Sequence, residues 1–238
     1  METTLVVFLV LIIFVSSFVR TAIGFGDSVI AMPILSVLFG LTTATPLIGI
    51  TTLSLGVLIL FKEKKSFSLS NITPLLIPTF VGIPIGIYCL TEEYESFFKA
   101  ILGLILILFA AFNLLNFKMK YAKSPLFFGF LAGVFGGAYN TLGPPIVVYA
   151  STQNWDTKTF KASLQGYFIV TEVAIVAGHG LKGLWTPIVL NYLLLSIPAL
   201  ILGFVLGNLL FGKLDERKSK FCINVFLIFM GVFLVVCG

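Results

Sequence analysis

Three charged residues lie within or beside long apolar segments of the chain, namely Arg20, Asp27 and Glu172. If these segments cross a membrane, a charge near the centre costs about 2.5–3.5 kcal/mol on insertion scales, so such residues are candidates for function. Arg20 has two interpretations: its guanidinium binds an anion through two parallel hydrogen bonds, or it extends along its helix to the cytoplasmic interface. Asp27 either pairs with Arg20 or caps the following helix, and capping is the expected role.

Glu172 is the residue best suited to carry a proton. It lies twelve residues into an apolar segment, and further apolar residues follow it at 173–176. Because burial penalises an ionised carboxyl, we expect Glu172 either to carry a coupling proton or to be a hydrogen-bonded structural carboxyl. His179, the only histidine of the sequence, is expected near the outer membrane surface as an interfacial residue.

Two breaks rich in glycine and proline interrupt the apolar segments, GFGDS at 24–28 and GGAYNTLGPP at 136–145. Irregular backbone at membrane depth persists only inside protein or beside water, and paired interruptions indicate a transport site. Helices that begin there offer free N–H groups and a positive dipole end, which favour an anion. The alternative is that the breaks only make tight turns between packed helices. The candidate substrate-binding residues are Gly24, Phe25, Gly26, Asp27, Ser28, Pro33, Gly137, Asn140, Thr141, Gly143, Pro144 and Pro145.

The elements that must position these residues are apolar helices. Of the 238 residues 58% are hydrophobic and 11% charged, with a mean hydropathy of +1.11, whereas soluble domains are about 25% charged. The fold class predicted is an all-α integral membrane protein whose single domain covers 1–238. The apolar segments are 4–19, 25–40, 43–61, 72–90, 97–116, 126–137, 143–151, 160–179, 187–210 and 219–237. Segments near 20 residues are long enough to cross a bilayer, and those predicted to do so are 43–61, 72–90, 97–116, 160–179, 187–210 and 219–237.

The two halves of the sequence resemble copies of each other. The matched residues are Gly24/Gly136 and Pro33/Pro145 at a separation of 112, Gly49/Gly166 at 117, and Gly82-xxx-Gly86/Gly203-xxx-Gly207 at 121. Repeat 1 covers about 1–117 and repeat 2 about 125–238, and each holds a broken or re-entrant helical hairpin followed by three transmembrane helices. The spaced glycines are predicted to be packing faces, because small residues let helix backbones approach closely.

Loop charges predict that the repeats are inverted. The loops 62–71, 117–125 and 211–220 are basic and the loop 91–98 is acidic. Since basic loops remain in the cytoplasm, the first three are predicted inside, and the acidic loop and both termini outside. The segment 126–151 then has both ends inside, so it enters the membrane and returns. The alternative is a parallel arrangement of the halves, with 211–220 outside.

The breaks carry a family resemblance. The run FVRTAIGFGDSVIAMPIL, and the run GFLAGVFGGAYNTLGPPIVVYAS followed by KTFKASLQGYF, resemble the two repeat signatures of the TauE/SafE family, over essentially the whole chain. The resemblance implies a duplicated membrane domain that moves small anions such as sulfite, sulfonates, sulfoacetate or related carboxylates. It places Gly24, Gly26 and Pro33 in the first signature, and Gly137, Asn140, Thr141, Gly143, Pro144 and Pro145 in the second. Asp27 departs from the family pattern and suggests a different substrate or coupling.

Other function classes lack support in the sequence. It contains no P-loop, no basic patch interleaved with aromatic residues, and three cysteines, Cys89, Cys222 and Cys237, that are isolated from one another. No enzyme activity, metal, cofactor or nucleic-acid partner is therefore expected. The predicted function is secondary transport of small anions by alternating access, in the cell membrane of a prokaryote, with lipid and a coupling proton or ion as partners. Homo-oligomerisation stays open, and the alternative function is an anion channel with re-entrant loops.

Overall fold

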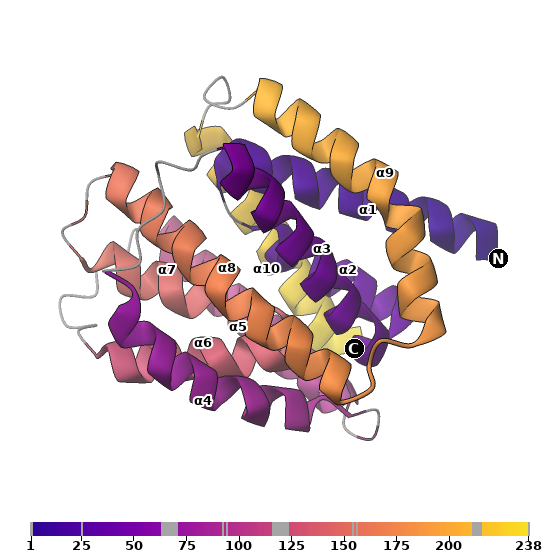
Figure 1. Cartoon of the computed structure of the whole chain (residues 1–238), viewed down its shortest axis with the longest axis horizontal. Coiled ribbons are helices and arrows are strands. Elements are labelled where there is room, and N and C mark those ends of the chain that lie inside the picture. The colour runs from indigo at the N-terminus through magenta and orange to yellow at the C-terminus, as the bar shows by residue number, and fades with distance from the viewer. Residues whose placement is uncertain are drawn as a thin grey trace.

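The computed structural model of the protein describes residues 2–24, 26–62, 71–91, 93, 95–115, 124–153, 155, 157–210 and 216–237. These residues form ten α-helices, which confirms the all-α prediction (Figure 1). The helices are α1 Glu2–Ile23, α2 Asp27–Phe39, α3 Leu41–Lys62, α4 Thr73–Cys89, α5 Glu95–Leu114, α6 Pro125–Tyr139, α7 Gly143–Ser151, α8 Thr157–Leu181, α9 Pro187–Leu209 and α10 Glu216–Cys237.

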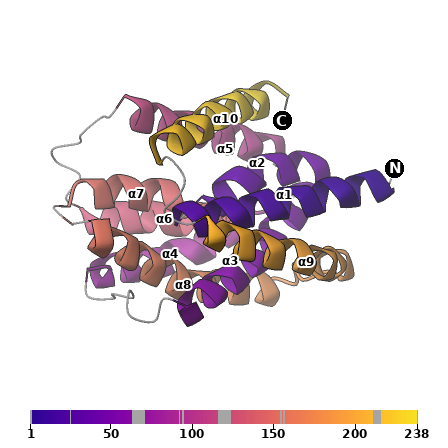
Figure 2. The ribbon, with the colours of Figure 1, turned by 90° about the horizontal axis from the view of Figure 1, so that it is seen from above.

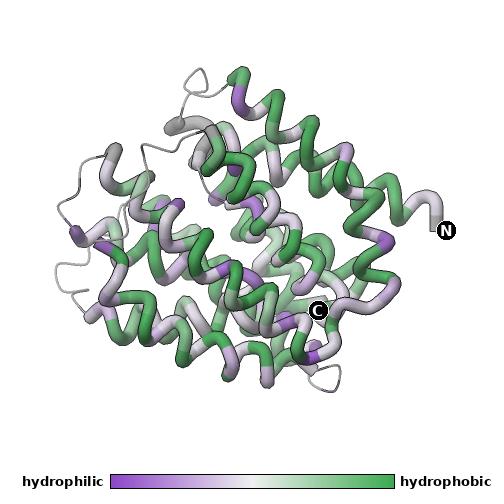
Figure 3. Tube along the Cα trace, viewed as in Figure 1, coloured by the Kyte–Doolittle hydropathy of each residue, from purple (hydrophilic) through white to green (hydrophobic). Residues whose placement is uncertain are grey.

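The surface of the helices is suited to lipid. Large apolar side chains point outward, with Ile77 70% and Leu104 52% exposed, and hydrophobic colour covers most of the trace (Figure 3). A water-soluble monomer rarely exposes so much contiguous apolar surface. Within the described residues, five helices are long and apolar enough to cross a membrane: Thr3–Ala22, Leu41–Phe61, Glu95–Leu114, Ala162–Leu181 and Pro187–Leu209. The protein is therefore a multi-pass membrane protein.

The helix lengths differ from the sequence prediction at two places. The first helix continues to Ile23, beyond the predicted segment 4–19, and reaches the length of a full span. The predicted crossing 72–90 corresponds to a shorter apolar helix, Thr73–Cys89, whereas α10, Glu216–Cys237, covers the predicted crossing 219–237. The loop residues 63–70, 117–123 and 211–215 lie outside the described residues, whereas Lys62 ends α3, and Arg217, Lys218 and Lys220 belong to the start of α10.

Both predicted breaks interrupt helices at equivalent places. The ends of α1 and α6, at Ile23 and Tyr139, are 116 residues apart, and so are the starts of α2 and α7 and the starts of α3 and α8. By this spacing Gly24 corresponds to Asn140. The predicted match of Gly24 with Gly136 is wrong for the break, because Gly136 lies inside α6 whereas Gly24 follows the end of α1.

The helices pack in crossed pairs, α1 against α9, α4 against α6 and α5 against α10 (Figures 1 and 2). Glycines make these contacts close: a Cβ added at Gly203 or Gly207 would lie 2.6 Å from a carbonyl oxygen of α1, and one at Gly86 would overlap the Val134 carbonyl of α6. The prediction that the spaced glycines are packing faces is confirmed, because only residues without a Cβ permit this backbone approach.

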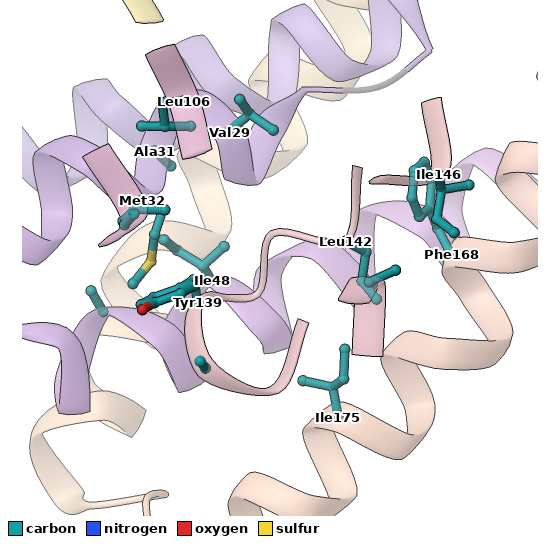
Figure 4. Close-up of a cluster of buried hydrophobic side chains, with 14 of the residues drawn as sticks. Val29, Ala31, Met32, Ile48, Leu106, Tyr139, Leu142, Ile146, Phe168 and Ile175 are labelled. Atoms are coloured by element: carbon teal, nitrogen blue, oxygen red, sulfur yellow. The ribbon is translucent and has the colours of Figure 1, made fainter. Parts of the chain in front are cut away.

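Two long helices, α3 and α8, lie side by side between the α1–α9 and α4–α6 pairs and contact each other (Figure 1). A buried apolar cluster fixes the second break against them (Figure 4). In it Met32 of α2 and Ile48 of α3 lie beside Tyr139, while Leu142 lies toward Ile175 of α8. This packing holds both ends of the 140–142 turn, so polar groups of the turn keep a fixed position relative to α3 and α8.

Candidate functional site

The first break is a tight turn between α1 and α2. Gly24 and Gly26 have φ angles of 103° and 105°, which side chains other than glycine rarely adopt. The Gly24 amide donates to the Arg20 carbonyl at 2.7 Å and closes α1, while the Gly24 carbonyl accepts from Gln165 Nε2 of α8 at 2.8 Å. Phe25, also predicted for the site, lies outside the described residues. The turn therefore places the last turn of α1 directly beside the start of α2.

Arg20 and Asp27 form a buried ion pair across this turn. Arg20 is 1% exposed, and its Nη1 donates to Asp27 Oδ2 at 2.7 Å and to the Thr52 carbonyl at 3.2 Å. The Thr52 hydroxyl also donates to Asp27 Oδ2, at 2.8 Å. The prediction that Arg20 extends to the interface is wrong, because a pair with these added hydrogen bonds offsets the cost of burial. Capping by Asp27 is also wrong, since α2 has no side-chain cap at its start.

One edge of the Arg20 guanidinium has no partner among the described residues. Both Nε and Nη2 are buried and lack a hydrogen-bond acceptor there. Nη2 lies beside Gly56 of α3, where an added Cβ would be 3.3 Å away from it. Nε and Nη2 point the same way from the planar guanidinium and form the fork that binds two oxygens of one anionic group. The first break therefore presents unpaired donors.

The second break ends α6 with a left-handed residue, Asn140, at φ 52° and ψ 29°. Its amide donates to the Gly136 carbonyl at 2.8 Å, and the Thr141 amide donates to the Phe135 carbonyl at 3.2 Å. The bond from the Asn140 amide to the Gly136 carbonyl is that of the αL motif, which satisfies a carbonyl at the end of a helix. The Thr141 hydroxyl donates to the Tyr139 carbonyl at 3.0 Å, so it is used within the turn.

The start of α7 offers fewer backbone N–H donors for an anion than the sequence predicts. Its first three residues are Gly143, Pro144 and Pro145, all buried. Proline nitrogens carry no hydrogen, so only Gly143 among these three supplies an N–H group. The first turn of α2 contains Asp27, Ser28 and Val29, each with an N–H. Donors for an anion are therefore concentrated at the first break, together with Arg20.

Glu172 and His179 of α8 both face the second break. Glu172 is 2% exposed, its Oε1 accepts a long hydrogen bond of 3.4 Å from Asn140 Nδ2, and its Oε2 has no partner among the described residues. His179 is fully buried, with Nε2 3.0 Å from the Gly137 carbonyl. The predicted interfacial role of His179 is wrong, because its ring turns inward to this carbonyl. A carbonyl only accepts, so Nε2 carries a hydrogen and donates it to this carbonyl.

One face of α3 contacts both breaks, although its residues are not among the predicted site residues. Thr45 donates to the Ala138 carbonyl at 3.2 Å, and a Cβ added at Gly49 would lie 3.2 Å from Asn140 Oδ1. Thr52 and Gly56 contact the Arg20–Asp27 pair, as described above. The spacing 45, 49, 52 and 56 of small or hydroxyl residues places them on one helix face and was the available signal. On α8 the corresponding signal is the seven-residue spacing of Gln165, Glu172 and His179.

The predicted site residues thus form two groups, and direct contacts join the residues within each group. Arg20 contacts Asp27 directly, and Asn140 contacts Glu172. The two breaks approach each other at α7, where a Cβ added at Gly143 would lie 3.7 Å from Val29 of α2. Arg20 and Asp27 also lie within electrostatic range of Glu172.

The remaining predicted residues have other positions. Ser28 is buried in the first turn of α2. Pro33 lies in the interior of α2 and so does not begin a helix. The backbone of Gly137 packs against Ile83 of α4. No group of three histidine, cysteine, aspartate or glutamate side chains that could hold a metal ion occurs among the residues that the structure describes.

The fold and these two interrupted helices define an all-helical multi-pass membrane protein with polar groups buried between its helices. The family model described as "Sulfite exporter TauE/SafE" matches residues 9–234. The chain therefore belongs to the TauE/SafE family of membrane transporters for sulfur anions, as its resemblance predicted. No curated protein and no solved structure matches it.

Proposed function

We propose that this protein is a secondary transporter that carries small sulfur oxyanions, organosulfonates or related carboxylates by alternating access. The observation that supports this best is the buried guanidinium of Arg20, whose Nε and Nη2 have no partner among the described residues. An unpaired buried donor of a charged group is costly. A bound oxyanion supplies the missing acceptors, so this edge of Arg20 is the proposed substrate anchor.

The geometry of the anchor selects a chemical class of substrate. A guanidinium fork binds two oxygens attached to one central atom, and sulfite, sulfonate and carboxylate groups share that arrangement. The backbone of Gly56 lies close to Nη2, and the N–H groups of the first turn of α2 form a positive helix end. The remaining predicted site residues at the second break complete the proposed site from the opposite repeat.

Glu172 is the group proposed to carry a proton during transport. It is buried within α8 and bonded to Asn140 of the second break. Among the described residues, Arg20, Asp27 and Tyr167 are titratable groups that interact electrostatically with it. A carboxyl in this position takes up or releases a proton when the charge of its neighbours changes. Binding of an anion at Arg20 changes that charge, which links the proton to the substrate.

Alternating access is proposed to occur between two inverted repeats, 1–117 and 125–238. The crossed packing supports this arrangement, because α1 of the first repeat packs on α9 and α6 of the second packs on α4. These two contacts are equivalent when α1 corresponds to α6 and α4 to α9. Inverted repeats with interrupted helices are common in secondary transporters.

The protein is proposed to lie in the cell membrane of a prokaryote with both termini outside. The start of α1 and the end of α10 lie in the same half of the molecule in both views, which supports a common side for the termini (Figures 1 and 2). The positive-inside rule, applied to the basic loops, then fixes that side as the exterior.

A thermal-shift panel with purified protein tests the proposed substrate class. Sulfite, short organosulfonates and small carboxylates are added at constant sodium and ionic strength, with chloride as the control anion. A ligand that binds the folded state at 100 times its Kd adds about 2.7 kcal/mol to stability, so a saturable rise in Tm is expected for at least one class. The absence of any saturable shift across the panel would contradict the proposal.

A flux assay separates the transporter from the alternative anion channel. In proteoliposomes a transporter gives uptake that saturates with substrate and is accelerated by substrate on the opposite side. A channel gives downhill flux with weak saturation and no such acceleration. Buried unpaired donors that bind the substrate favour the transporter, because a bound and occluded substrate is a step of alternating access.

A further inference from the structure

A small cavity lies beside Asp27, where α1, α2 and α3 converge. Its volume is about 10 Å³, enough for one water molecule or an ion of similar size. Its polar lining consists of Ser16 and Ser17 of α1, Asp27 of α2, and Thr51 and Thr52 of α3. Arg20 does not line it. The cavity and the unpaired edge of Arg20 are therefore two separate places, joined by the Arg20–Asp27 pair.

Three of the four hydroxyl groups in the polar lining have only acceptor positions left for the cavity. Three of its hydroxyl groups already donate their hydrogen elsewhere, Ser16 to the Ile13 carbonyl at 3.1 Å, Thr51 to the Ile48 carbonyl at 3.0 Å and Thr52 to Asp27 Oδ2 at 2.8 Å. A hydroxyl group has one hydrogen and two lone pairs. What these groups have left for the cavity is therefore oxygen lone pairs, which repel an anion and attract a cation.

Asp27 adds a negative charge to this lining. The hydrogen bonds and the ion pair that Asp27 makes with the described residues all use Oδ2. A carboxylate oxygen together with hydroxyl oxygens is the ligand set that hard cations prefer. Asp27 is the first residue of α2, so its carboxylate supplies the negative charge of this lining next to the first break.

We propose that this cavity binds Na+ through Asp27 Oδ1 and the hydroxyl oxygens of Ser16 and Thr51, and that this Na+ is a coupling ion for the anion. The cavity has room for an ion of the size of a water molecule, and its acceptor oxygens favour a cation. The binding of Na+ does not depend on the proposed function, whereas its coupling role rests on the proposed function.

The order of charges explains how the two ligands are coupled. The charges alternate in sign from each group to the next one that it contacts. They are positive on Na+, negative on the Asp27 carboxylate, positive on the Arg20 guanidinium and negative on the oxyanion. Without Na+, the full charge of Asp27 neutralises Arg20 at 2.7 Å and competes with the oxyanion. With Na+ on Oδ1, Arg20 binds the oxyanion more strongly, and by linkage the oxyanion strengthens the binding of Na+ by the same factor.

The test begins with Na+ alone, in the absence of any oxyanion substrate. Full-length protein in detergent is titrated with NaCl or with choline chloride at matched ionic strength, and Tm is recorded. We expect a saturable rise with NaCl only. In Thr51→Val and in Ser16→Ala the midpoint of the Na+ titration rises by at least about tenfold, as for loss of a group that supports a metal ion. Ser54→Ala is the matched control, because Ser54 is exposed on α3 and donates only to its own helix at Ile50. Its midpoint stays unchanged.

The second part measures the dissociation constant of sulfite with and without Na+. The proposal predicts tighter sulfite binding in Na+ for the wild type, and a smaller effect of Na+ in Thr51→Val. Equal stabilisation by Na+ and choline overturns the Na+ site and leaves a cavity that holds water only. Stabilisation by acid without any effect of Na+ also overturns it, in favour of a protonated Asp27. Na+ binding that leaves the affinity for sulfite unchanged overturns the coupling role. If sulfite and the other anions fail to bind at any Na+ concentration while Na+ itself binds, the proposed function fails and the Na+ site does not.

Discussion

Replacement of Arg20 by lysine separates the charge of the anchor from its shape. Lysine keeps the positive charge and can still pair with Asp27, so it avoids the penalty of about 3–5 kcal/mol for leaving a buried charge without its partner. It lacks the fork formed by Nε and Nη2, the two atoms that have no partner among the described residues. Arg20→Lys should therefore weaken anion binding more than it lowers stability.

The size of the effect follows from the bonds that are lost. Each hydrogen bond to a charged group contributes about 1.5–3 kcal/mol. Lysine can replace at most one of the two bonds of the fork, so the variant loses at least one. At 1.4 kcal/mol for each tenfold change, the Kd for the bound oxyanion should rise by about 10- to 100-fold.

The assay is isothermal titration calorimetry with the best anion of the thermal-shift panel, accompanied by the Tm of each variant. Lys99→Arg is the matched control, since Lys99 forms the other ion pair of the described residues, with Glu95 at 2.8 Å and near the surface. Its Kd should equal that of the wild type. A Kd for Arg20→Lys within about threefold of the wild type, with Tm preserved, would refute the assignment of this edge as the anchor.

Three further predictions use the second break, α8 and the loops. Gly137→Ala should lower Tm, because a Cβ there overlaps the Ile83 carbonyl of α4. Gly143→Ala should leave Tm unchanged, because its Cβ makes an ordinary contact at 3.7 Å. Equal Tm values for the two variants would contradict the packing. Glu172→Gln keeps the acceptor for Asn140 but cannot release a proton, so proteoliposomes with this variant should lose accumulation driven by a pH gradient and retain anion binding and exchange; unchanged accumulation would show that Glu172 is structural. A cysteine at position 215, in a background without other cysteines, should resist an impermeant thiol reagent added to intact cells, and labelling from outside would overturn the proposed orientation.

The breaks and the packing faces could be predicted because their signals are local. A left-handed turn needs glycine at positions such as Gly24 and Gly26, and close helix contacts need the glycine spacing found in α4 and α9. The family resemblance depends on the same residues. Particular residue types at fixed spacing indicate backbone requirements of this kind, so these requirements can be recognised before any tertiary structure is known.

The directions of the polar side chains could not be predicted in the same way. The membrane helices are apolar on nearly every side, so no amphipathic pattern distinguishes the inner face from the lipid face. His179 near the end of α8 was expected at the interface, and only the approach of the Gly137 carbonyl turns it inward. Likewise, Asp27 was expected to cap α2, but Arg20 and Thr52 together hold its carboxylate away from that role. These contacts join residues from different helices. Spacing along one helix shows which residues share a face, but it does not show which residues of another helix that face contacts.

Counterflow of radiolabelled sulfite tests the central claim most directly. Proteoliposomes are loaded with unlabelled sulfite, diluted into a trace of labelled sulfite at constant Na+ and pH, and followed over time. The account predicts a transient accumulation of label above equilibrium in the wild type, which saturates with external sulfite and shifts to higher concentration in Arg20→Lys. Label that only equilibrates, with a rate proportional to concentration and the same in Arg20→Lys, would contradict both the transporter mechanism and the role of Arg20.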